Sequence, residues 1–237
     1  MPNNTQSVLA ARQRLSPLFV VSPSTRCGST FVQRLLNSSG DVLIYGENPT
    51  LIEGLPIVLG AVIANYSGAR AEAKAATRHR SMNEGTDDWI PDLSPEPSGY
   101  LDLSIAQMVE QFLFYEEDAK AFDRTNWGLK FPLRDATVMA VIAHVLPQAR
   151  FIVLYRDVAA ALASARGRHF VTDEASARLF VQRWSANLVW LINWSARRKL
   201  DLRYEDLVAN PEEHLPKLQA FAGIGETTPE VFANRLN

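Results

Sequence analysis

The chain has 237 residues, 47% of them hydrophobic, and its 24 Lys and Arg against 26 Asp and Glu give a net charge of −2. This composition predicts a soluble domain with a sizeable core, and the charge balance argues against nucleic acid or a membrane surface as partner. A single cysteine, Cys27, excludes an internal disulfide, and residues 1–16 lack the apolar core of a signal peptide. No apolar run approaches membrane-spanning length, so we expect a cytoplasmic protein.

The first strand and helix follow a polar lead-in over residues 1–16. The apolar run 18–21 is ended by Ser-Pro and predicts a buried parallel strand. After Gly28, apolar residues recur at helical spacing and predict a helix that ends near 37–40: Phe31, Val32, Leu35 and Leu36.

Residues 77–100 contain three prolines, two glycines and no periodicity. Such a stretch predicts a long loop, which we regard as a candidate lid. The other predicted elements are strands at 41–49, 127–132, 150–155 and 200–207, and helices at 51–66, 103–115, 138–145, 157–167, 173–192 and 211–221.

Strands and helices alternate along the whole chain. This alternation predicts an α/β fold of three layers, a central parallel sheet flanked by helices, in a single domain over residues 17–237.

The junction between the first strand and its helix is a candidate anion site. In parallel sheets, ligands bind where strands end and helices begin, because a helix N-terminus offers unpaired N–H groups and a positive dipole. Gly28 lets the backbone approach a ligand, Ser29 and Thr30 offer hydroxyls, and Arg26 adds a fixed charge. The alternative is that Ser29 and Thr30 only cap the helix.

Two well-known anion loops do not fit this segment. A nucleotide-kinase P-loop needs an earlier glycine and a lysine after Gly28, where the chain has Ser29. A phosphatase loop needs an arginine six residues after its cysteine, where the chain has Gln33. Cys27 is therefore more easily interpreted as a small packed residue than as a nucleophile.

The loop "TRCGST", residues 25–30, resembles the 5′-phosphosulfate loop of sulfotransferases that use PAPS (3′-phosphoadenosine 5′-phosphosulfate). In that family, a strand leads into a sequence such as Pro-Arg-Ser-Gly-Ser/Thr-Thr and then into a helix. The resemblance implies that the loop residues bind the nucleotide: Arg26, Cys27, Gly28, Ser29 and Thr30.

The family's 3′-phosphate motif, an arginine at a strand end with a serine eight residues later, is also present. Arg156 directly follows the strand at 150–155, and Ser164 is eight residues on. Arg168, one helical turn further, matches a second basic residue of the tyrosylprotein branch of the family. The alternative for these positions is an ion pair between Arg156 and Asp157 with a surface serine.

The segment "YEDLVANPEEHL", beginning at Tyr204, resembles the Tyr-Glu-Asp-Leu segment and Asn-Pro helix start of the same family. It implies that Tyr204 helps to hold the nucleotide, although a tyrosine at a strand end is often structural. With three motifs in order over 18–47 and about 127–222, the resemblance implies the P-loop-like sulfotransferase fold.

The resemblance also implies a reaction, the transfer of a sulfuryl group from PAPS to a hydroxyl of a small-molecule acceptor with PAP as product. Positioning and charge stabilisation dominate such displacements, and the acceptor hydroxyl needs a base. Glu47, after the second strand, is the candidate base, although it could instead start a helix before Pro49. Lys130 matches a family lysine near the transferring group, and Arg26 would face the 5′-phosphate.

Two other function classes remain open, a kinase that uses ATP and a non-catalytic relative that binds PAP or PAPS. The histidines show no ligand spacing, so we expect no metal. His169, beside Arg168, is a weak second candidate for the active site. The basic, glycine-bearing loop that ends the animal cytosolic enzymes has no counterpart after Phe221, which leaves open how the adenosine and 3′-phosphate are held. Acceptor identity and oligomeric state do not follow from the sequence.

Overall fold

The computed structural model describes residues 2–83, 93–228 and 230–233. Its helices are α1 (Pro2–Ala11), α2 (Ser29–Asn37), α3 (Leu55–Tyr66), α4 (Gly68–Asn83), α5 (Pro97–Ala121), α6 (Val138–Val145), α7 (Val158–Gly167), α8 (Glu174–Asn193), α9 (Tyr204–Ala209), α10 (Pro211–Ala222) and α11 (Glu230–Ala233), with a π-helical turn, η1 (Thr50–Gly54). Its strands are β1 (Leu18–Ser22), β2 (Val42–Tyr45), β3 (Asn126–Pro132), β4 (Arg150–Tyr155) and β5 (Lys199–Arg203).

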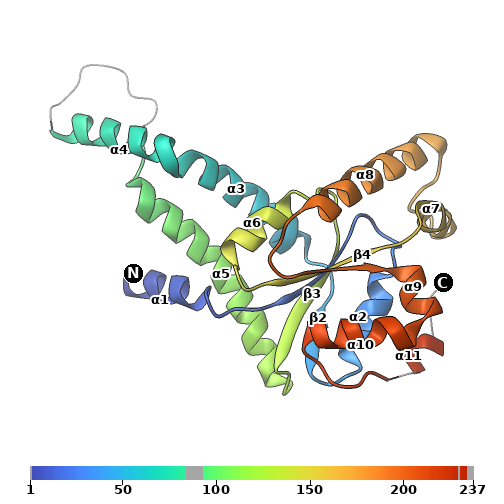
Figure 1. Cartoon of the computed structure of the whole chain (residues 1–237). Helices are drawn as coiled ribbons and strands as arrows, with labels where there is room; N and C mark the ends of the chain where they lie inside the picture. Colours follow the sequence, from blue (N-terminus) through green and yellow to red (C-terminus); the bar gives the residue numbers. More distant parts are fainter. Residues whose placement is uncertain (1, 84–92, 229, 234–237) are drawn as a thin grey trace.

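The five strands form one parallel sheet in the order β2-β3-β1-β4-β5. Along β1, successive side chains enter opposite cores. Phe19 and Val21 pack with residues of α1, α3, α5, α6 and α8, whereas Leu18 and Val20 pack with residues of α2, α9, α10 and α11. Because both faces of the strand are buried, it is apolar at every position from Leu18 to Val21. The predicted three-layer α/β architecture is confirmed (Figure 1).

The structure differs most from the sequence-based expectation in three places; in addition, the strand predicted at 41–49 spans only Val42–Tyr45, and the helix predicted at 51–66 is divided into η1 and α3. The lead-in is not simply polar: most of it is helix α1, which lies along α5 and buries Val8, and Leu15 follows in the same core. The loop expected at 77–100 is shorter, because α4 continues to Asn83 and α5 begins at Pro97. What remains of the candidate lid between the two helices is 84–96; of this, 84–92 lies outside the described residues, and the lid stays a prediction.

The third difference concerns the last strand. The strand predicted at 200–207 ends at Arg203, and Tyr204 begins the short helix α9. The next helix then starts with Pro211, a residue favoured in the first helical turn because its missing N–H has no partner there in any case. Tyr204 therefore leaves the sheet at the carboxyl end of β5.

Figure 1 shows α3, α4 and the first part of α5 running away from the strands. Among the described residues, no single helix has both the length and the apolar content needed to cross a membrane; the bent pair Thr50–Tyr66 and Gly68–Asn83 meets those criteria only when taken together.

The buried amide of Asn187 ties α8 to the segments that leave β1 and β3. Its Nδ2 donates to the carbonyl of Pro23 at 3.0 Å and to that of Leu133 at 3.1 Å, and its Oδ1 accepts from the N–H of Ala136 at 2.9 Å. Three backbone segments thus depend on one side chain, and the one at Pro23 begins the loop into α2.

Replacing Asn187 with leucine is expected to lower the free energy of unfolding by about 2–4 kcal/mol, because it leaves buried backbone groups without partners. Urea denaturation measures the change. The matched control is Asn193→Ala on the same helix, where the side chain is exposed and should cost no more than about 0.5 kcal/mol. Equal costs at the two positions would contradict this role for Asn187.

Candidate active site

The loop between β1 and α2 contains two residues in the left-handed region of backbone conformation. Gly28, the residue before the first turn of α2, has φ 92°, and Arg26 has φ 68°. Glycine adopts this region readily, whereas arginine does so at a cost. The loop therefore turns sharply into the N-terminus of α2, where the first N–H groups have no partner within the helix.

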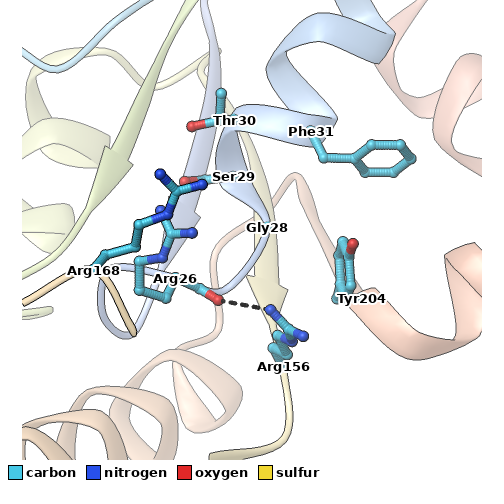
Figure 2. Close-up of a pocket in the computed structure, with 8 residues that line it drawn as sticks. All are labelled: Arg26, Gly28, Ser29, Thr30, Phe31, Arg156, Arg168 and Tyr204. Atoms are coloured by element: carbon cyan, nitrogen blue, oxygen red, sulfur yellow. Dashed lines mark hydrogen bonds between the residues drawn. The ribbon is translucent and has the colours of Figure 1, made fainter. Parts of the chain in front are cut away.

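A pocket of about 280 Å³ lies over this turn. Its lining brings together residues that are far apart in the sequence: Arg26, Gly28, Ser29, Thr30, Phe31, Arg156, Arg168 and Tyr204. Figure 2 shows Arg26 and Arg168 on one side of Gly28 and Phe31 and Tyr204 on the other. All of these except Phe31 are candidate residues of the sequence analysis, which assigned Phe31 to the apolar stripe of its helix.

Three guanidinium groups border the pocket. Arg26 Nε donates to Ser164 Oγ at 3.0 Å, and the pKa of the Arg26 guanidinium is lowered by burial and then by the charges of Arg168 and Arg156. Among the described residues, neither Arg26 nor Arg156 forms an ion pair with a carboxylate. Like charges held together in this way are stabilised by an anion.

Arg156 leaves the end of β4 and reaches the far side of the loop. Its Nη1 donates to the carbonyl of Arg26 at 3.4 Å, and its guanidinium carbon lies 5.0 Å from the centre of the Tyr204 ring. Its Nε is buried and has no hydrogen-bond partner within the part of the chain that the structure describes. A buried donor without a partner carries a desolvation cost that a bound acceptor would remove.

The Tyr204 ring fills the space that a side chain at position 28 would occupy. A Cβ on Gly28 would lie 2.3 Å from Tyr204 Cδ2. The same ring meets Phe31 edge to face, with centroids 5.8 Å apart. Position 28 thus requires glycine for its conformation and for this contact.

Two of the candidate nucleotide-binding residues do not line the pocket. Within the described part of the chain, Ser164 contacts it only through Arg26. Cys27 is fully buried, its Sγ lies 3.6 Å from Ser24 Oγ, and burial raises the pKa of its thiol. A raised pKa disfavours the thiolate, as expected for a packed rather than a nucleophilic cysteine.

Glu47 and Lys130 form an ion pair beside the pocket. Lys130 Nζ lies 2.7 Å from Glu47 Oε1 and 3.4 Å from Oγ1 of Thr30, which lines the pocket. The lysine side chain is 9% exposed and the glutamate 46%, so the carboxylate is the member open to solvent. Glu47 does not start a helix, because η1 begins only at Thr50.

Neighbours of Glu47 fix its segment to α5. Tyr45 donates its hydroxyl to Asp118 at 2.6 Å, and Asn48 Nδ2 donates to the hydroxyl of Tyr115 at 2.8 Å. These hydrogen bonds could not be predicted from the sequence, since the partners lie about 70 positions apart and no motif joins them. They place the Glu47 carboxylate at the carboxyl end of β2.

The histidines lie outside this arrangement. His169 follows α7 with φ 59° and lines a separate hollow with Arg166 and Asp173. Within the described ranges, no cluster of three or more His, Cys, Asp or Glu side chains could hold a metal ion.

A family model described as "Sulfotransferase family" matches residues 17–228. The fold resembles the sulfotransferase domain of an olefin synthase from Synechococcus PCC 7002, with a TM-score of 0.56 and 19% identity over 94% of this chain and 78% of that one. It also resembles the sulfotransferase domain of the curacin biosynthetic pathway, with a TM-score of 0.55 and 17% identity over 92% and 77% of the two chains. A sulfotransferase from Alicyclobacillus acidocaldarius gives a TM-score of 0.50 and 13% identity over 92% and 88%. No curated protein matches in sequence.

Proposed function

Because the chain belongs to the sulfotransferase family, we propose that it transfers a sulfuryl group from PAPS to a hydroxyl group of a small-molecule acceptor. The family generally uses PAPS as donor and releases PAP. The single observation that carries the proposal is the pocket over the β1–α2 turn, where Arg26, Arg156 and Arg168 converge on a helix N-terminus.

The residues present fit a nucleotide that carries phosphate at two positions. Ser29, Thr30 and the first N–H groups of α2 are donors for the 5′-phosphosulfate, with Arg26 as the nearby cation. Arg156, with its buried and unpartnered Nε, and Arg168 are the donors for the 3′-phosphate. Ser164 holds Arg26 in place, and Tyr204 borders the nucleoside side.

The bound donor supplies a sulfuryl group whose bond to the 5′-phosphate oxygen breaks as a bond to the acceptor oxygen forms. We propose that Glu47 takes the proton of the acceptor hydroxyl, since its carboxylate is exposed beside the pocket. Lys130 and Arg26 offset the negative charge that develops on the leaving phosphate. Lys130 contacts both Glu47 and Thr30, which supports a position of its ammonium group between the base and the bound 5′-phosphosulfate.

Calorimetric titration with PAP and with ATP tests the proposal on the wild type and on Arg156→Ala. PAP is expected to bind more tightly than ATP, and Arg156→Ala to weaken PAP binding by about 10- to 100-fold, the loss typical of a charge-assisted contact. The matched control is Arg166→Ala, which removes an exposed arginine of α7 that pairs with Glu174 of α8 and should leave the PAP affinity unchanged.

Other outcomes separate the alternatives. Tighter binding of ATP would favour a kinase, although Ser29 stands where a kinase loop has lysine. If the folded protein binds neither nucleotide, the loop would serve only to cap α2. PAP binding without any turnover in an acceptor screen would indicate a non-catalytic relative.

A further inference from the structure

The last described segment of the chain folds back along α2. The N–H of Gly225 donates to Asp41 Oδ2 at 2.7 Å, and the N–H of Thr228 donates to Ser38 Oγ at 2.9 Å. Both acceptors belong to the turn that follows α2. These hydrogen bonds fix the start of the tail and direct α11 towards the helix that begins at the pocket (Figure 1).

Phe232 of α11 is the first of three aromatic rings that lead into the pocket. Its ring meets that of Phe31 edge to face, with centroids 5.3 Å apart. Phe31 meets Tyr204 in the same way, and both of these residues line the pocket, whereas Phe232 does not. The Tyr204 ring in turn contacts the guanidinium of Arg156.

In the described part of this tail, the contact that leads to the pocket is apolar. Residues 222–233 contain no lysine or arginine, and Arg235 lies outside the described residues. The tail contributes the Phe232 ring, which packs against one side of Phe31. Without that ring, Phe31 and Tyr204 would gain conformational freedom, which ligand binding would then have to remove.

We propose that Phe232 is a positioning residue for the nucleotide pocket: it holds Phe31, and through Phe31 the ring of Tyr204, where the two border the nucleoside. This rests on the proposed function, because it takes the ligand to be PAPS or PAP. By linkage, a nucleotide that binds better when Phe232 is docked must also stabilise the docked tail.

The test is calorimetric titration with PAP of the wild type, Phe232→Ala and Phe232→Leu. Phe232→Ala is expected to weaken PAP binding by about 3- to 10-fold, the factor that corresponds to one lost aromatic pair, and Phe232→Leu by less. The matched control is Phe221→Ala, which removes a partly buried phenylalanine from the same hydrophobic cluster. It should leave the PAP affinity unchanged despite a comparable loss of stability, and if Phe232→Ala fails to fold, Phe232→Leu carries the comparison.

Hydrogen exchange of residues 230–233 provides a second readout. If Phe232 had only a structural role, PAP would not change this exchange. PAP is expected to slow this exchange in the wild type and not in Phe31→Leu, where the connecting ring is missing. A wild type that does not bind PAP would overturn the proposed function and this proposal together. A wild type that binds PAP, with Phe232→Ala and Phe221→Ala equal in affinity or with exchange of the tail unaffected, would overturn only the role of Phe232.

Discussion

Replacing Glu47 with glutamine is expected to lower the turnover number by about 100- to 10,000-fold, the range for loss of a general base. Glutamine keeps the shape of the side chain and an oxygen for Lys130, but it cannot take the acceptor's proton. The affinity for PAP should change by no more than about 2-fold, because Glu47 does not line the arginine pocket and no charge-assisted contact to the nucleotide is lost. Release of PAP from PAPS, followed with an acceptor found by screening, measures the turnover.

Glu53→Gln is the matched control for this substitution. Glu53 lies six residues further along the same segment, and its carboxylate accepts from the N–H of Arg134 and approaches the Arg134 guanidinium at 3.6 Å, away from the pocket. It should retain turnover close to that of the wild type. If Glu47→Gln were equally active, another residue would have to be the base, and Glu47 would serve only to hold Lys130.

The sheet and the loop at the end of β1 could be predicted because their signals are local. The run 18–21 is apolar at every position, as a strand covered on both faces requires, and the structure buries all of it. The helix predicted at 157–167 is present, and Asp157 caps it: its side chain accepts from the N–H of Ala160. Gly28 is predicted to let the backbone approach a ligand, and this stays a prediction; in the structure the Tyr204 ring occupies the space that a side chain at position 28 would fill.

Other features depend on contacts between distant segments, and no local pattern reveals them. Helix α4 has no buried residue, so its polar sequence shows no apolar stripe, and its last residues, 77–83, were interpreted as the start of a loop. The hydrogen bond from Arg26 to Ser164 joins positions 138 apart, and a single sequence shows no coupling between them. Phe31 was recognised as apolar, but its place beside the pocket depends on where α9 puts Tyr204.

Gly28→Ala is expected to abolish detectable PAP binding, a loss of at least about 100-fold, and to lower the free energy of unfolding by about 2–4 kcal/mol. Two costs combine. The left-handed conformation at φ 92° is unfavourable for alanine, and the new methyl group would lie 2.3 Å from Cδ2 of Tyr204. The tyrosine ring must therefore move. The same ring also contacts the guanidinium of Arg156. Calorimetry with PAP and urea denaturation measure the two effects.

A double-mutant cycle with Tyr204→Ala separates the two costs. Removing the ring leaves space for the methyl group, so Gly28→Ala should be less destabilising in the Tyr204→Ala background, and the remaining cost is that of the backbone conformation. Gly167→Ala, at the end of α7, is the control. Nothing lies within 4 Å of its added Cβ, so it should be neutral or stabilising by up to about 1 kcal/mol. Equal effects of Gly28→Ala with and without the Tyr204 ring would show that steric contact is not what requires glycine at this position.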